Sequence, residues 1–150
     1  MGKMNVPRIV LGGVVAGILC FIGDGIVHGV LLKERWMQLG SALGRAGSPD
    51  ATNMAEWVLY DLAKGLVGVW LYAAIRPRFG AGPRTGAIAA VVTWLLVLPI
   101  AMLGFLPATS LGRRFLFIWS IDGLVVMLIA IGAGAWLYRE EGSAAVPART

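Results

Sequence analysis

The sequence is poor in the residues from which soluble proteins build their surfaces and much of their chemistry. Only 14% of its 150 residues are charged and 58% are hydrophobic, which is too apolar for a soluble domain of this length. Its single cysteine, Cys20, excludes a disulfide within the chain, and its single histidine, His28, excludes a bis-histidine haem site within it. A zinc-type Cys/His cluster, a phosphate-binding glycine loop and a serine beside a base are all absent, so we predict that the protein is not an enzyme.

Four apolar runs are long enough to cross a bilayer, for which about 20 residues are needed. We therefore predict an all-α fold in which one domain, a four-transmembrane-helix bundle, has both termini on the same side and a short polar tail at residues 139–150. A kink is expected at Pro99 in the third span. The predicted spans are residues 9–32, 54–75, 86–106 and 115–138.

The first apolar run follows basic residues, as the core of a signal peptide does. It is longer than a typical signal core, contains Asp24 and offers no convincing cleavage site, so we interpret it as a retained helix. The stretch after it carries Trp36, Leu39 and Leu43, which predict a short helix resting on the membrane surface.

The basic residues flank the apolar runs, which is typical of membrane-edge anchors and not of a nucleic-acid interface. There are 13 Lys and Arg against 8 Asp and Glu. A small excess of basic residues on the side of the termini favours cytoplasmic termini. That side carries Lys3, Arg8, Arg76, Arg78, Arg84, Arg139 and Arg149, and the other carries Lys33, Arg35, Arg45, Arg113 and Arg114.

Two stretches, "KGLVGVWLYAAIRPRFGAGPRTG" and "GAGAWLYRE", resemble an uncharacterised family of small bacterial integral membrane proteins with four predicted helices. The resemblance covers most of the chain loosely and these two stretches closely. It implies a location in the bacterial inner membrane and supplies neither an activity nor catalytic residues. The tripeptide WLY occurs in both stretches at the end of a span, and we interpret it as part of an aromatic belt.

Five ionisable residues inside the predicted spans form a candidate polar cluster: Asp24, His28, Asp61, Lys64 and Asp122. At about 1.5 Å per residue, Asp24 lies about 12 Å, and Asp61 and Asp122 about 10 Å, below the boundary away from the termini. The three aspartates thus share one layer, with Lys64 deeper and His28 one turn nearer the surface. Because a charge at mid-span costs roughly 2.5 to 3.5 kcal/mol, we expect these groups to face inward. Asp61 is expected to pair with Lys64 and Asp24 with His28, which leaves Asp122 unpaired unless it shares Lys64, a proton or a bound ion.

Two of the polar residues have structural interpretations that we favour over functional ones. For His28, a hydrogen-bonded histidine between helices is favoured over a metal or haem ligand. The sequence "NMAE" fits a capping box, with Asn53 as the N-cap and Glu56 at the third helical position.

The first span also carries two GxxxG motifs, Gly13 with Gly17 and Gly25 with Gly29, on either side of Asp24. Such spacing lets helix backbones approach closely in lipid. We predict that this helix packs against protein along most of its length. The sequence leaves open whether its neighbour belongs to the same bundle or to a second copy, so a homodimer is one possible assembly.

Three functions from different classes remain open. The first is a non-enzymatic, self-associating bundle or an accessory subunit of a membrane complex, in which the polar layer holds helices together. The second is a dimeric proton- or cation-coupled transporter that uses Asp24, Asp61 and Asp122. The third is a metal- or pigment-binding protein built around His28 with Asp24 or Glu56. Under the first, favoured hypothesis no cofactor, no bound metal and no nucleic acid are expected, and the partners are the lipid bilayer and other membrane proteins.

Overall fold

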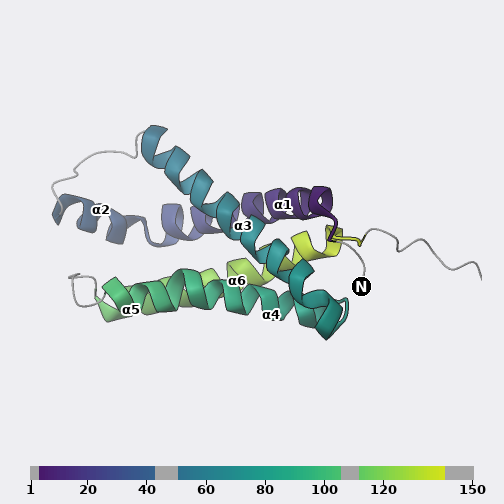
Figure 1. Ribbon diagram of the computed structural model, residues 1–150. Helices are drawn as coiled ribbons and strands as arrows, with labels where there is room; N and C mark the ends of the chain where they lie inside the picture. Colours follow the sequence, from purple (N-terminus) through teal and green to yellow (C-terminus); the bar gives the residue numbers. More distant parts are fainter. Residues whose placement is uncertain (1–3, 43–50, 106–111, 141–150) are drawn as a thin grey trace, which may run out of the picture.

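The computed structural model describes residues 4–42, 51–105 and 112–140, and every element within these ranges is a helix (Figure 1). Two short π-helical turns, η1 and η2, interrupt the longer helices. The elements in chain order are α1 (Val6–Ile26), η1 (Val27–Leu31), α2 (Lys33–Ala42), α3 (Ala51–Phe79), α4 (Pro83–Leu95), η2 (Leu96–Ile100), α5 (Ala101–Phe105) and α6 (Arg113–Leu137).

Four helical segments are long and apolar enough to cross a membrane, which confirms the predicted all-α bundle. They are Val6–Leu31, Met54–Phe79, Pro83–Gly104 and Arg113–Leu137. Large apolar side chains cover the outside, since Val30, Leu59, Phe117 and Trp136 are between 67% and 84% exposed. This surface suits lipid, and the architecture is that of a multi-pass membrane protein. Leu43, the third connection at residues 106–111 and the tail from residue 141 lie outside the described residues.

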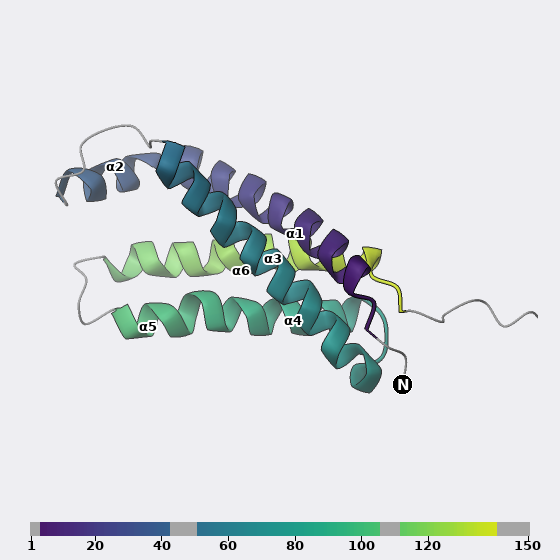
Figure 2. The same ribbon diagram turned by 45° about the horizontal axis from the view of Figure 1, so that its top comes forward.

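The first and last spans begin and end at the same end of the bundle, as predicted. The backbone N–H of Asn5, the N-cap of α1, donates to the hydroxyl of Tyr138, just beyond α6, at 3.3 Å. Figure 2 shows this end together with the turn between α3 and α4, while α2 and α5 lie at the opposite end. We call the two ends the termini end and the α2 end.

Glycines on α1 allow it to pack closely between α3 and α6. A Cβ atom at Gly17 would lie 2.6 Å from the Cα of Leu62 on α3, and one at Gly12 would lie 2.5 Å from the carbonyl oxygen of Gly134 on α6. Gly13 is also crowded by α3. The first GxxxG motif, Gly13 and Gly17, therefore lies at the crossing of α1 with α3.

The second GxxxG motif, Gly25 and Gly29, does not pack against another helix among the described residues of this chain, so of the two neighbours left open for it the same bundle does not supply one. A Cβ atom at either position would meet nothing within 4 Å among the described residues. The reason is helical phase: the buried positions of α1 are 9, 12, 13, 16, 17, 20 and 24, and this stripe passes through Asp24 and misses its neighbour Gly25.

The boundaries of α3 differ from the prediction at both ends. The helix begins at Ala51, two residues before Asn53, so Asn53 is not its N-cap and the predicted capping box with Glu56 is wrong. It also continues beyond residue 75 to Phe79, with Pro77 inside its last turn. Gly80, with φ of 85°, then ends the helix.

Pro99 interrupts the third span, as predicted. It lies in η2, where the wider π turn accommodates a residue that has no N–H and whose ring would clash with a preceding carbonyl in an α-helix.

In both WLY tripeptides the tryptophan is exposed and the tyrosine is buried. Trp70 and Trp136 are 50% and 84% exposed, as expected for an aromatic belt. Tyr72 and Tyr138 are instead buried, and their rings meet edge to face with centroids 6.0 Å apart. The tyrosines therefore pack α3 against the end of α6.

The packing of the first glycine motif can be tested with alanine variants. We expect Gly17→Ala to lower the free energy of unfolding by about 1 to 3 kcal/mol, because the added methyl overpacks the α1–α3 crossing. Gly132→Ala on α6 is the control and should be neutral or stabilising, since it enters open space and lies outside both GxxxG motifs. Unfolding of the purified protein in mixed micelles, followed by circular dichroism, measures both. Equal losses for the two variants would contradict the packing described.

Candidate functional site

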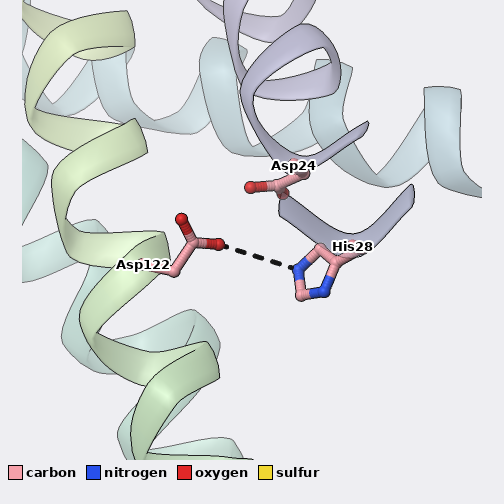
Figure 3. Close-up of side chains that lie close together, drawn as sticks. All are labelled: Asp24, His28 and Asp122. Carbon is pink, nitrogen blue, oxygen red and sulfur yellow. Dashed lines mark ion pairs between the residues drawn. The ribbon is translucent and has the colours of Figure 1, made fainter. Parts of the chain in front are cut away.

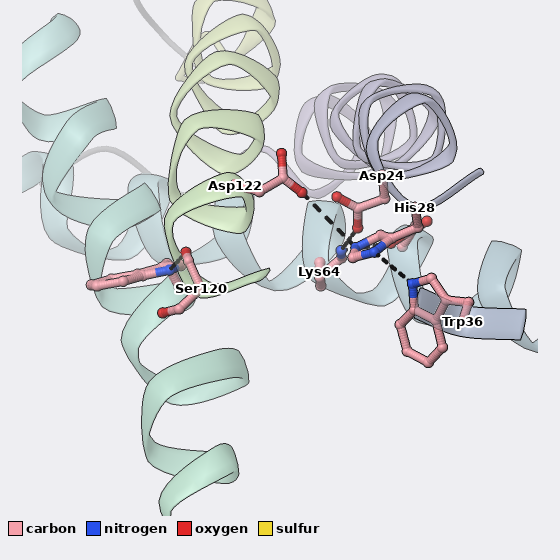
Figure 4. A network of polar contacts seen from close by, with 8 residues as sticks. Asp24, His28, Trp36, Lys64, Ser120 and Asp122 are labelled. Atoms are coloured by element: carbon pink, nitrogen blue, oxygen red, sulfur yellow. Dashed lines mark hydrogen bonds and ion pairs between the residues drawn. The ribbon is translucent and has the colours of Figure 1, made fainter. Parts of the chain in front are cut away.

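Lys64 lies between two carboxylates in the interior of the bundle. Its Nζ atom is 2.5 Å from Oδ2 of Asp24 on α1 and 2.6 Å from Oδ1 of Asp61 on its own helix, α3. The three side chains are buried, at 4%, 11% and 1% exposure for Lys64, Asp24 and Asp61. Figure 4 shows the contact of Lys64 with Asp24. Because buried charges require close partners, this double ion pair fixes α1 against α3.

His28 faces Asp122 rather than Asp24. Its Nε2 atom is 3.9 Å from Oδ2 of Asp122 on α6, and the two side chains are 15% and 14% exposed. The expected pair of Asp24 with His28 is not formed, because Asp24 accepts a hydrogen bond from the ammonium of Lys64, a stronger partner than an imidazole. Figure 3 shows Asp24, His28 and Asp122 converging from α1, η1 and α6.

The structure brings all five ionisable residues of the predicted layer into one cluster. Ligand-type atoms of Asp24, His28 and Asp122 lie within 4.8 Å of one another, and Asp24 continues the cluster to Lys64 and Asp61. Three spans, α1 with η1, α3 and α6, contribute to it. We call these five residues the charge cluster.

A hydrogen bond from α2 determines where the proton of His28 lies. The indole Nε1–H of Trp36 donates to Nδ1 of His28 at 3.1 Å (Figure 4). An indole N–H is a donor only, so Nδ1 must be the unprotonated nitrogen of a neutral ring. The remaining proton is therefore on Nε2, the nitrogen that faces Asp122.

Three tryptophans surround the His28 ring, and the sequence analysis did not predict this. The ring centroids of Trp36, Trp57 and Trp119 lie 5.7, 6.5 and 5.5 Å from that of His28. A signal was present, since Trp57 precedes Asp61 by four residues and Trp119 precedes Asp122 by three, which puts each tryptophan on the same helix face as an aspartate.

The charge cluster holds more negative than positive charge. With its three carboxylates ionised and His28 neutral, only Lys64 opposes them. Within the described residues, Oδ2 of Asp122 is buried and has no hydrogen-bond partner. A buried carboxylate oxygen without a donor is costly, so Asp122 is the member whose charge is least well compensated.

The arrangement does not fit a metal site, although three ligand-type side chains lie close together. A histidine that binds a metal ordinarily donates its other ring N–H to a neighbour, whereas Nδ1 of His28 accepts a hydrogen bond. The nitrogen that faces the carboxylates then carries a proton and has no lone pair to offer. Glu56, the alternative ligand that we considered, is exposed. The metal- or pigment-binding hypothesis therefore finds no support in this geometry.

Comparison with known protein families, with curated proteins and with solved structures found no match for this chain. The functional argument therefore rests on the fold and on the charge cluster.

Removing Lys64 tests whether the cluster holds the bundle together. We expect Lys64→Met to lower the free energy of unfolding by about 3 to 5 kcal/mol, because it leaves Asp24 and Asp61 buried without a cation. The triple variant Lys64→Met/Asp24→Asn/Asp61→Asn should recover most of the loss. Unfolding in mixed micelles is again the measurement, and a Lys64→Met protein as stable as the wild type would contradict this role.

Proposed function

We propose that this chain is a non-enzymatic membrane protein that works by association, either with itself or as an accessory subunit of a membrane complex. The observation that carries the proposal is that the most deeply buried charges are paired with one another inside the chain. Lys64 binds Asp61 on its own helix and Asp24 on α1, and so joins α1 to α3. A charged layer used in this way favours a structural role over a catalytic one.

The exposed glycine motif supports self-association. Gly25 and Gly29 are exposed on the lipid-facing surface, and each leaves open space where a side chain would stand. In lipid, helices associate through such close backbone approach, and these two glycines are not used inside the chain.

The location follows from separate arguments. We propose the bacterial inner membrane, on the resemblance of two stretches to small bacterial membrane proteins. The excess of Lys and Arg on the side of the termini supports cytoplasmic termini.

Self-association can be tested by filling the exposed motif. We expect Gly29→Leu to weaken or abolish oligomers in mild detergent without unfolding the chain, because the new side chain enters a helix–helix contact between copies. Gly132→Leu on α6 is the matched control, since it also enters open space but lies outside the motif. Light scattering coupled to gel filtration, with mass spectrometry of co-purifying proteins, gives the assembly. If the wild type travels as a single chain without partners, the proposal is wrong.

A dimeric proton- or cation-coupled transporter is the second candidate, and one observation favours it. Asp122 has a buried carboxylate oxygen without a hydrogen-bond partner in the described structure, and such a group can take up a proton or a cation.

Proteoliposomes separate the two candidates. Under the proposed function, vesicles that contain the purified protein should show no proton or monovalent-cation flux above empty vesicles, and Asp122→Asn should change only stability or assembly. Flux that Asp122→Asn abolishes in a folded, correctly assembled protein would establish the transporter instead.

A further inference from the structure

The helical path between His28 and Trp36 places the two residues in contact. The π turn η1 is closed by a hydrogen bond from the Leu32 N–H to the Val27 carbonyl at 2.8 Å, and α2 begins at the next residue. The chain thus turns directly after η1, and Trp36, in the first turn and a half of α2, comes back against the His28 ring. Single π turns are frequent at functional sites.

The hydrogen bond from Trp36 exists only while His28 is neutral. A second proton would have to bind at Nδ1, the nitrogen that accepts from the Trp36 indole. Both groups would then be donors pointing at one another, and the bond would be lost. Protonation of His28 therefore requires Trp36 to move.

The imidazolium that forms has a partner on its other side. Its Nε2–H faces Oδ2 of Asp122 across 3.9 Å, and that oxygen lacks a hydrogen-bond donor among the described residues. A charged ring moving toward α6 would shorten this distance and satisfy Asp122. Protonation thus exchanges a hydrogen bond to α2 for an ion pair to α6.

Charged groups on every element packed around His28 influence whether its ring is neutral or protonated. Asp24 lies on its own helix, Asp61 and Lys64 on α3, and Asp122 on α6. Three carboxylates against one ammonium favour an added proton, whereas burial of the ring among tryptophans opposes it. An unperturbed imidazole changes its charge between about pH 5 and pH 8.

We propose that His28 is a proton-binding site that works as a latch: while neutral it holds α2 through Trp36, and on taking up a proton it releases Trp36 and pairs with Asp122. The proton comes from a hydronium ion of the solvent, whose O–H bond breaks as the Nδ1–H bond forms, and no other covalent bond changes. This goes beyond the proposed function, because it gives the α2 end of the bundle a response to pH whether or not the chain associates.

The latch can be observed directly because His28 is the single histidine of the chain. The full-length protein, purified with a tag that contains no histidine and labelled with ¹⁵N in histidine and tryptophan, is titrated in lipid nanodiscs. At high pH the imidazole signals should show a proton on Nε2 and none on Nδ1. The indole N–H signal of Trp36, identified by its loss in Trp36→Phe, should move with the same midpoint as His28.

The latch predicts how the midpoint of the His28 titration shifts in each of three variants. Trp36→Phe removes the bond that stabilises neutral His28 and should raise the midpoint of the His28 titration by roughly 0.5 to 1 pH unit, the equivalent of one hydrogen bond. Asp122→Asn removes the anion that pairs with the charged ring and should lower it. Trp57→Phe, at a tryptophan that stacks on His28 without bonding to it, should leave it nearly unchanged.

The wild-type titration decides the matter even if a variant fails to fold. A proton found on Nδ1 at high pH, or a Trp36 signal that stays fixed while His28 titrates, would overturn the latch. So would a midpoint that Trp36→Phe leaves unchanged. None of these results bears on the oligomeric state, so the latch and the proposed function fail independently.

Discussion

The ammonium of Lys64, held between the carboxylates of Asp24 and Asp61, is the interaction on which the positions of the other helices depend. An ion pair inside a membrane bundle tolerates little displacement, because separated charges lose their partners where no water replaces them. It sets the register of α1 against α3, and the glycines at their crossing let the backbones come close enough for the pair to form. With α1 so fixed, His28 one turn further on is carried to Asp122 on α6.

The sequence alone predicted the spans and the layer in which the charged residues lie, because hydrophobic length and helical rise depend only on spacing along the chain. It also predicted the pair of Asp61 with Lys64, three residues apart on one helix, which the structure confirms. It did not predict which partner Asp24 takes. Whether Asp24 binds His28 four residues away or Lys64 forty residues away is decided by how α1 and α3 cross, and spacing within one helix contains no such information. The grouping of three tryptophans around His28 was not predicted for the same reason, since Trp36, Trp57 and Trp119 come from three separate helices. The two GxxxG motifs looked alike in sequence, and only the buried stripe of α1 distinguishes them.

The charge cluster combines two kinds of polar contact that place different demands on the bundle. The pairs around Lys64 are short, deeply buried and suited to a permanent structural role. The contacts of His28 are longer, lie nearer the α2 end and involve a side chain whose charge can change. A bundle with charges in its interior needs the first for stability. The second, the contacts of His28, can change with pH while the pairs around Lys64 keep the fold.

The π turn η1 carries a consequence for how the chain can vary. Each residue added to or removed from a helix turns everything beyond it by about 100° and shifts it by about 1.5 Å. The eight-residue separation of His28 and Trp36 includes this turn, and their hydrogen bond depends on it. Loss of one residue between them, with reversion to regular α-helix, would leave Trp36 seven residues and about 10.5 Å along the axis from His28, too far for this hydrogen bond. The segment therefore tolerates changes of side chain far better than changes of length.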